Sequence, residues 1–292
     1  MLQILFNGLV SGLLVALPAL ALALSFSILR FANFAIGAML TLGAYVIYFF
    51  NVALGWPLQF AALAGIVLGG LIAVAVDWLV YRPLRGRSGV TLLVASMGVA
   101  LVMENAVRFV AGGTPLGYDV EPARPTRFPS LDALGGLRVN HEQWLIAAVS
   151  LGSLAVVWVL FGHSRLGRAM RAVADNAALA AVRGVSRDRT VAAMWFVSGA
   201  LASAGGLLVG LDATLDPQMG WNYLLPVFAA AILGGVDKPM AAVFGALVMG
   251  VASELSTLVI PSHYRTVVAF VVLGALLLVR PWGVFGQARV TR

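Results

Sequence analysis

The sequence predicts an all-α protein, a polytopic integral membrane helical bundle of about eight or nine spans, folded as a single transmembrane domain over residues 1–292. Of its 292 residues, 61% are hydrophobic and 11% are charged, whereas soluble domains carry about 25% charged residues. The mean hydropathy of +0.97 agrees with this composition. Apolar runs near the roughly 20 residues that cross a bilayer recur along the chain. Together these observations exclude a water-soluble fold.

The apolar runs are bounded by charge, glycine or proline. The first extends from Ile4 to Leu29 behind an N-terminus without basic residues. It exceeds the roughly 7 to 15 apolar residues of a signal-peptide core, so we expect a retained span. The later runs lie near 34–50, 58–80, 90–111, 143–161, 190–211, 222–236, 240–260 and 266–280.

Arginines in the connections predict the orientation. Residues 82–87 hold three arginines, residues 165–189 hold six, and the C-terminal tail holds Arg280, Arg289 and Arg292. Because short basic loops face the cytoplasm, a cytoplasmic loop at about 163–189 and a cytoplasmic C-terminus are expected. Residues 112–142 carry four acidic residues, three arginines and four prolines, which predicts an irregular external loop. The net charge of +7 therefore indicates a lipid bilayer as partner and no nucleic acid.

Two segments predict discontinuous helices in related halves of the chain. Polar residues interrupt the apolar stretch at residues 30–37, and residues 222–236 form a short run closed by Gly234 and Gly235. Unwound backbone at membrane depth needs a cavity beside it, so such breaks indicate a transport pathway. We expect it to be lined near Asn33, Phe34, Gly37, Ser96, Gly98, Gly234, Gly235 and Glu254. Arg30, Asp237 and Lys238 leave open the alternative that both breaks are cytoplasmic surface loops.

Small residues recur at four-residue spacing in several spans. The pairs and triplets are Gly8 and Gly12; Gly65 and Gly69; Ala202, Gly206 and Gly210; and Ala246 and Gly250. Such spacing allows helices in a membrane to approach closely. We therefore predict helix packing at these positions, with a direct role of the glycines in a pore as the alternative.

No motif in the chain indicates ATP binding. The phosphate-loop pattern is missing, and the single lysine, Lys238, precedes Pro239. Uphill transport would then need a partner ATPase or an ion gradient, and ion-coupled carriers keep acidic or histidine relays inside the membrane. Glu104 can pair with Arg108 one turn later, and Asp77 can pair with nearby arginines. Glu254 has no such neighbour, so a functional role and an interhelical hydrogen bond both remain open.

Enzymatic and metal chemistry is not expected. The chain has no cysteine, and His141, His163 and His263 fall in separate connections, which does not make a metal site. No nucleophile elbow occurs either. The protein is predicted to be no enzyme, with no cofactor of its own.

The arginine-rich segment predicts a helix at the cytoplasmic face. Residues 165–183 are rich in alanine and favour a helix; Gly184 is placed to end it and Ser186 to begin the next span. A short helix of small side chains suits docking into a groove on another protein. A surface helix attracted to anionic lipid is the alternative.

Three blocks in this order resemble LivH-type branched-chain amino acid ABC permeases. They are the "N-F-A-x-G" element at residues 33–37, the loop Gly167-Arg168-Ala169-Met170-Arg171-Ala172 with Gly184-Val185, and the "F-x-A-A-x-L-G-G" element at residues 228–235. Residues 91–105 are similar as well, so the likeness covers nearly the whole chain. The chain departs from the family in having Asp237, Lys238 and Pro239 after the Gly-Gly pair, where smaller residues are frequent.

The resemblance implies an importer subunit in the bacterial inner membrane. Its partners would be a second, related permease subunit, two cytoplasmic ATPase subunits that hold ATP and Mg²⁺, and an extracytoplasmic solute-binding protein. By similarity, Asp175, Asn176, Ala177, Ala178 and Gly184 match the loop that contacts the ATPase, and Arg168, Arg171 and Arg187 belong to the same loop. The solute would be a branched-chain or hydrophobic amino acid; urea, short amides and aromatic acids are alternatives. An ion-coupled secondary transporter and a passive channel remain as rival functions.

Overall fold

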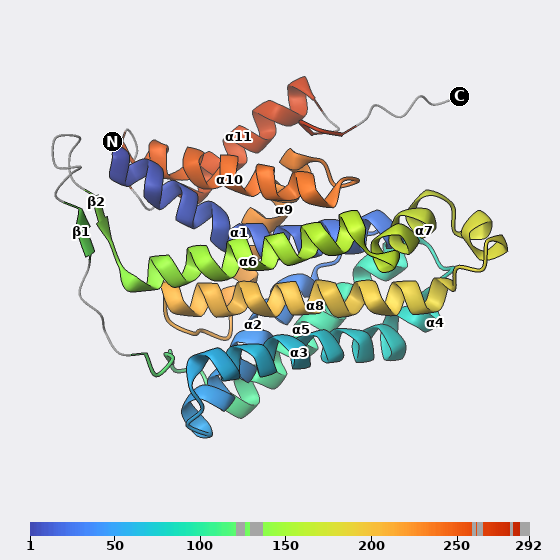
Figure 1. The fold of residues 1–292 in the computed structure, drawn as a ribbon, viewed down its shortest axis with the longest axis horizontal. Helices are drawn as coiled ribbons and strands as arrows, with labels where there is room; N and C mark the ends of the chain where they lie inside the picture. The colour runs from blue at the N-terminus through green and yellow to red at the C-terminus, as the bar shows by residue number, and fades with distance from the viewer. Residues whose placement is uncertain (121–125, 129–136, 259–260, 262–264, 281–282, 287–292) are drawn as a thin grey trace.

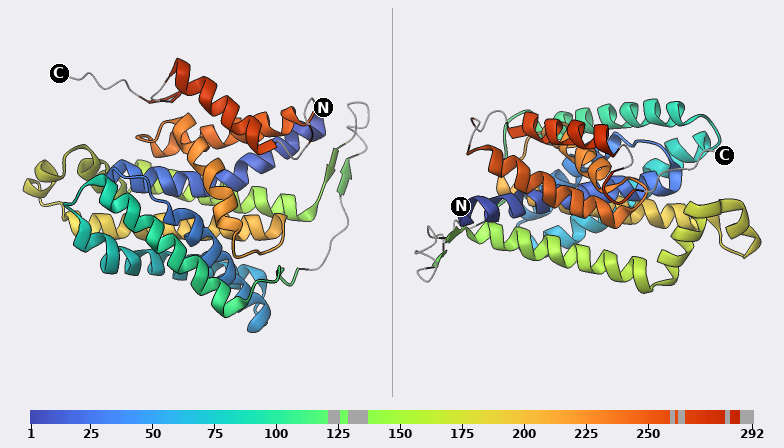
Figure 2. Two further views of the ribbon diagram at one scale, coloured as in Figure 1. Left: turned by 180° about the vertical axis from the view of Figure 1, so that it is seen from behind. Right: turned by 90° about the horizontal axis from the view of Figure 1, so that it is seen from above.

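The computed structural model describes residues 1–120, 126–128, 137–258, 261, 265–280 and 283–286. Its helices are α1 (Leu2–Leu29), α2 (Ala35–Tyr48), α3 (Leu58–Val76), α4 (Arg82–Leu84), α5 (Gly89–Ala111), α6 (His141–His163), α7 (Arg165–Val182), α8 (Arg187–Asp212), α9 (Met219–Gly234), α10 (Pro239–Ser256) and α11 (Arg265–Val279). Helices α2 and α3 continue into π-helical turns, Phe49–Ala53 and Asp77–Tyr81. Figures 1 and 2 show these helices as one bundle.

Each of the nine predicted apolar runs contains a helix of this bundle. Within the described residues, 7 helical segments are long and apolar enough to cross a membrane, and α9 is a shorter apolar helix. The predicted polytopic membrane bundle is therefore confirmed. Helix α11, of 15 residues, is short for a full crossing.

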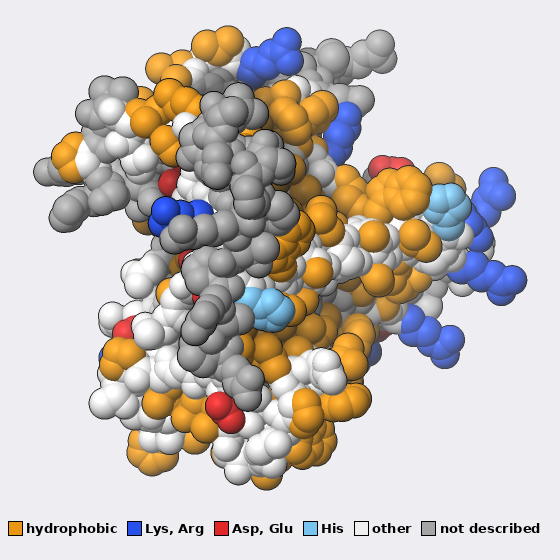
Figure 3. Space-filling model, turned by 60° about the vertical axis from the view of Figure 1, so that its left-hand side comes forward, with side chains coloured by type: hydrophobic (Ala, Val, Ile, Leu, Met, Phe, Trp, Pro, Cys, Tyr) orange, Lys and Arg blue, Asp and Glu red, His pale blue; other side chains and the backbone are white. Residues whose placement is uncertain are grey.

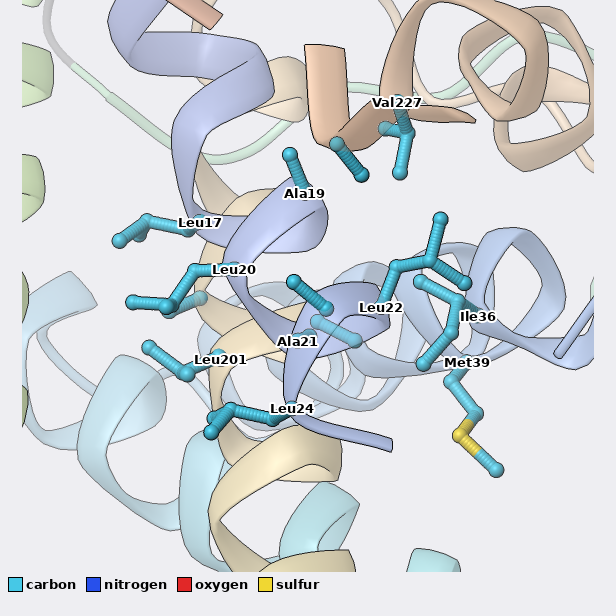
Figure 4. Packing of buried hydrophobic residues seen from close by; sticks show 14 of the residues in the cluster. Leu17, Ala19, Leu20, Ala21, Leu22, Leu24, Ile36, Met39, Leu201 and Val227 are labelled. Atoms are coloured by element: carbon cyan, nitrogen blue, oxygen red, sulfur yellow. The ribbon is translucent and has the colours of Figure 1, made fainter. Parts of the chain in front are cut away.

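Helix α1 lies at the centre of the bundle and packs against α6, α8, α9 and α10. Its middle is almost continuously buried. In Figure 4, Leu22 of α1 lies with Ile36 of α2 below Val227 of α9, while Leu20 and Leu24 point toward α8. A helix that is apolar on all sides belongs in such a central position.

The α1–α10 contact depends on glycine. A Cβ added to Gly8 or Gly12 would lie 2.8 Å from the Cα of Val251 or Leu247, and one added to Gly250 would lie 2.5 Å from the Cα of Gly12. Each distance is below the 3.4 Å at which ordinary contact begins. The predicted close packing of helices at these small residues is confirmed.

One end of the bundle carries a β-ribbon. Strands β1 (Thr126–Phe128) and β2 (Leu137–Val139) pair antiparallel, so the loop predicted to be irregular contains a short ordered ribbon. Gln3 fixes its place, because its side-chain amide donates to the carbonyl of Arg138 at 3.0 Å and accepts from the Arg138 amide at 2.9 Å. We call this the β-ribbon end.

The opposite end holds residues 30–34, α4, α7, the start of α8 and residues 235–238. We call it the arginine-rich end. In Figure 3 the largest group of Lys and Arg side chains lies at the right, and hydrophobic side chains cover much of the surface elsewhere in that view. Figure 1 shows α7 projecting beyond the bundle at this end.

Candidate functional site

The two predicted helix breaks meet at the arginine-rich end. The first follows α1, which closes at Arg30 with left-handed backbone angles, φ 59° and ψ 32°. The second follows α9, which ends at Gly235 with φ 115°. Arg30 Nη1 lies 2.8 Å from Asp237 Oδ1, and the rings of Phe34 and Phe228 are 5.0 Å apart. Segments about 200 residues apart in sequence thus lie side by side.

The first break is ordered by buried polar contacts. Asn33 Oδ1 accepts from the amide of Ala35, the first residue of α2, at 3.1 Å. It also accepts from the Tyr81 hydroxyl at 3.2 Å. The amide of Phe34 donates to Ser96 Oγ of α5 at 3.1 Å. Both Asn33 and Ser96 are fully buried. In this conformation they form a packed junction between α2, α3 and α5.

The remaining pathway candidates lie in four places. Gly37 packs against α9, where an added Cβ would lie 2.5 Å from the Gly220 carbonyl oxygen, and Gly234 packs against α10. Gly98 lies on the exposed face of α5, where an added Cβ would have nothing within 4 Å. Glu254 is buried near the β-ribbon end and accepts from Ser11 Oγ at 3.2 Å. The structure therefore does not bring the predicted pathway residues into one cluster.

An ion-pair network joins α3 to α8. Arg85 pairs with buried Asp77 and, at 3.0 Å, with Asp188, which Arg82 also contacts at 3.0 Å. The sequence predicted that arginines neutralise Asp77, and this is confirmed. It gave no sign of Asp188, because pairing across about 100 residues needs a tertiary fold.

An aromatic stack connects this network to the first break. The rings of Tyr81 and Trp195 stack at 4.8 Å with an interplanar angle of 6°, and both residues are fully buried. Tyr81 in turn donates to Asn33. Sequence analysis missed both aromatic residues, since an aromatic residue in an apolar run is ordinarily a packing residue.

The segment predicted to dock a partner, residues 165–183, consists of two helices joined by a bend. The sequence predicted one short helix, but Asn176 has φ −155° and ψ 102° inside α7. Its Oδ1 accepts from the amide of Leu179 at 3.0 Å, which is the contact of an N-cap. Asparagine competes with the helix backbone in this way, so it ends one helix and begins the next over residues 177–182.

Both predicted caps beside this short helix are confirmed. Gly184 has φ 80°; its amide donates to the Ala181 carbonyl at 2.9 Å and the Val185 amide to the Ala180 carbonyl at 3.0 Å, the pattern of a Schellman motif. Ser186 Oγ accepts from the Arg189 amide at the start of α8. The chain therefore turns sharply at both ends of residues 177–182.

The surface of the short helix is apolar. Ala178 is exposed, Leu179 is 60% exposed and Val182 is 83% exposed. Asp175 and Arg187 are exposed on either side, whereas Ala177 is half-buried. An exposed apolar surface of this kind marks contact with another protein or with the membrane surface.

Two of the predicted docking residues, both exposed, also hold the base of α7. Arg168 Nη1 donates to the His163 carbonyl at 3.4 Å, and Arg171 Nη1 donates to the Phe161 carbonyl. Ser164 caps the start of α7 by accepting from the Gly167 amide at 2.9 Å. These contacts fix the turn between α6 and α7.

Comparison with known proteins identifies the family. Residues 4–279 match the model of the family described as "Branched-chain amino acid transport system / permease component". The chain belongs to this permease family. The permease is 29% identical to the high-affinity branched-chain amino acid transport system permease protein LivH of Escherichia coli K12 and 29% identical to BraD of Pseudomonas aeruginosa, which bears the same description. In both cases the alignment covers 100% of the permease and 97% of the relative.

A solved structure entitled "PsaBC from Streptococcus pneumoniae in complex with Fab" shares 13% identity with the permease. The match has a TM-score of 0.49 and covers 94% of the permease and 91% of that chain. Family membership rests on the sequence matches, which confirm the resemblance and show a multi-pass transport permease.

Three acidic residues within the described spans have partners. Glu104 lies 3.3 Å from Arg108, as predicted, Asp77 pairs with Arg85, and Glu254 has an interhelical hydrogen bond from Ser11. Among the described residues no group of three or more His, Cys, Asp or Glu could hold a metal ion. His263 lies outside the described residues.

Proposed function

We propose that this permease is the membrane subunit of an ABC importer for amino acids with branched or otherwise hydrophobic side chains. The family match and the names of LivH and BraD as branched-chain amino acid transport permeases support the solute class. Energy would come from ATP and Mg²⁺ held by partner ATPase subunits, because the chain has no phosphate-binding loop.

The observation that carries the proposal is the short helix at residues 177–182. It projects from the bundle at the arginine-rich end and exposes Ala178, Leu179 and Val182. Small and apolar side chains on an exposed helix fit a groove on a partner protein. We infer that each of two cytoplasmic ATPase subunits receives one such helix, which places the arginine-rich end and the C-terminus in the cytoplasm of a bacterium.

The opposite end would face the solute-binding protein. The positive-inside rule places the β-ribbon end outside the inner membrane once the arginine-rich end is cytoplasmic. A binding protein that releases solute there would deliver it to the bundle from outside. Transport would then proceed by alternating access, driven by ATPase closure at the other end.

The exposed face of α5 is proposed to meet the second permease subunit and the solute path. Gly98 and Asn105 lie on this face one heptad apart, and Asn105 is exposed. A polar side chain within a span faces a protein neighbour or water rather than lipid. The exposed face of α3, by contrast, carries Phe60, Leu63, Val67 and Leu71, which suits lipid.

This arrangement can be tested with single cysteines, since the chain has none. In membranes holding the complete transporter, we expect a water-soluble maleimide to label Asn105→Cys and an amino acid solute to protect it. Leu63→Cys on α3 should remain unlabelled. If Asn105→Cys stayed as unlabelled as Leu63→Cys, this face of α5 would not border an aqueous path.

An ion-coupled mechanism has less support. The acidic residues that could form a relay are engaged by Arg108, Arg85 and Ser11. The discriminating measurement is uptake in vesicles without ATP, which the proposed importer cannot perform.

The test of the function is association with the ATPase subunit. Ala178→Glu should abolish co-purification with a co-expressed ATPase and the stimulation of ATP hydrolysis, because it places a charge on the apolar docking surface. Ala53→Glu, at an exposed alanine near the β-ribbon end, is the matched control. Reversing Arg168 and Arg171 is less specific, since both hold the α6–α7 turn. Unchanged association of Ala178→Glu would contradict docking through this helix.

The solute is tested separately. Proteoliposomes that contain the permease, its permease partner, the ATPase and the binding protein should accumulate leucine, isoleucine or valine when ATP is supplied. Accumulation of urea, a short amide or an aromatic acid in place of these amino acids would support the importer function and identify a different solute.

A further inference from the structure

Arg30 joins three segments at the arginine-rich end. Its Nη1 lies 2.8 Å from Oδ1 of Asp237 in the second helix break. Its Nη2 donates to the carbonyl of Ala174 in α7 at 3.3 Å. Arg30 itself belongs to the first break. One side chain thus connects both breaks to the segment that leads into the proposed docking helix.

The backbone at Arg30 is unusual. Its backbone amide closes α1 by donating to the Phe26 carbonyl at 2.8 Å. Its φ of 59° makes it the one non-glycine residue with positive φ in the described part of the chain. A residue with a Cβ is disfavoured in this region, where glycine is free of strain. Backbone geometry alone therefore favours glycine at position 30, and the presence of arginine must have its reason in the side chain.

The side chain suits this position because of its shape. A guanidinium is a planar fork with five N–H donors, so it can bond to the Asp237 carboxylate and the Ala174 carbonyl at once. A lysine ammonium has no such fork. The contact also gives a partner to Asp237, one of the residues in which this chain departs from the family pattern.

The breaks joined by Arg30 adjoin other helices. Phe34 contacts Phe228 of α9 and donates its amide to Ser96 of α5. A displacement of α7 that Arg30 transmits would therefore reach α9 and α5 through packed side chains. The route from α7 to α9 and α5 is therefore short: it passes from Ala174 to Arg30, along the first break to Phe34, and from Phe34 to Phe228 and Ser96.

We propose that Arg30 is a positioning residue that ties α7 to both helix breaks, so that movement of the docking segment moves the two breaks together. The proposal rests on the proposed ATPase-driven function. Arg30 and Asp237 are each 46% exposed, and exposed ion pairs contribute little to stability. The contact should therefore matter for coupling more than for folding.

The decisive variant is Arg30→Gly. Glycine accepts the positive φ, so the variant should insert, keep the thermal stability of the unmodified chain and associate with the ATPase as before. Solute uptake per ATP hydrolysed should fall about fivefold, the lower end of typical coupling effects. Unchanged uptake per ATP in Arg30→Gly would overturn the proposal.

Two further variants separate the contacts. Exchanging the charges, Arg30→Asp with Asp237→Arg, should restore the pair between the two breaks but not the contact with α7, because a carboxylate cannot donate a hydrogen bond to the Ala174 carbonyl. Uptake per ATP should therefore stay as low as in Arg30→Gly, and its recovery would show that the link to α7 is not needed. Arg30→Lys should couple better than Arg30→Gly and worse than arginine, because one ammonium cannot serve both acceptors.

Arg82→Gln is the matched control. Arg82 is 49% exposed, lies at the same end and pairs with Asp188, but Asp188 also keeps its contact with Arg85. This substitution should leave uptake per ATP unchanged. A loss as large as that of Arg30→Gly would mean that any arginine at this end has the same effect, and it would refute the specific link.

A labelling measurement is independent of the ATPase. In the purified chain, a cysteine at Ala32 in the first break should react with a water-soluble maleimide about threefold faster when Arg30→Gly is present, because the break is then less restrained. Equal rates overturn the link. If the unmodified chain fails to bind any ATPase, the proposed function fails, and this measurement still decides whether Arg30 restrains the break.

Discussion

Replacing Gly250 by alanine should destabilise the bundle more than any change of one methyl group at its surface. An added Cβ would lie 2.5 Å from the Cα of Gly12, about 0.9 Å inside the 3.4 Å limit of ordinary contact. The obstacle is backbone, so no side-chain rotation can relieve it. Helices α1 and α10 must separate along their shared contact, and overpacking of this kind costs about 1–3 kcal/mol.

The separation would also weaken contacts beyond position 250. Gly8 and Gly12 approach the backbone of α10 at Val251 and Leu247, and helix association in a membrane depends on such close packing. We therefore expect a loss of about 3 kcal/mol in the free energy of unfolding, the upper end of the range.

The assay is reversible unfolding of the purified protein in detergent, followed by circular dichroism as denaturant increases. Gly152→Ala in α6 is the control, because an added Cβ there meets nothing within 4 Å. It should be neutral or stabilising by up to about 1 kcal/mol from helix propensity. If Gly250→Ala were as stable as Gly152→Ala, the α1–α10 contact would not be as close as described.

Three further predictions concern the docking segment and the buried acid. Gly184→Ala should reduce ATPase association about fivefold, since a Cβ at its φ of 80° costs about 1 kcal/mol. The control is Gly55→Ala, which has a φ of 67° and equally free space and should leave ATPase association unchanged. Co-purification with the ATPase measures both variants. Asn176→Ala should weaken the same association about fivefold through loss of an N-cap worth about 1 kcal/mol, and Asn176→Asp should retain it. Glu254→Gln should keep ATP-driven uptake within about twofold, because glutamine still offers an oxygen to Ser11; loss of uptake would instead indicate an ion relay.

Local signals in the sequence were sufficient for the caps and for one ion pair. Gly184 and Ser186 end and begin helices as predicted, and Glu104 pairs with Arg108 one turn later. Each of these depends on residues within about four positions of one another. The bend at Asn176 was missed although its cap is equally local, because the helix propensity of the surrounding alanines outweighed a single asparagine in the prediction.

The pathway candidates show the limit of such signals. Both breaks were found from polar residues in apolar runs, but their meeting through Arg30 and Asp237 was not. Burial of Asn33 and Ser96 and exposure of Gly98 were equally out of reach. A linear pattern shows that a helix is interrupted; it does not show which neighbour satisfies the freed backbone.

The sequence by itself determined that this chain is an α-helical membrane protein, because crossing a bilayer requires long apolar helices and leaves arginine to mark one side. Its permease family follows from the sequence resemblance and the family match. Only the tertiary structure decided which helices pack at glycine contacts, that Asp188 and Asp237 pair with distant arginines, and which side chain joins the two breaks to α7. Those contacts form between residues distant in sequence, and they depend on the angle and depth at which helices pack, which are not encoded in any single span.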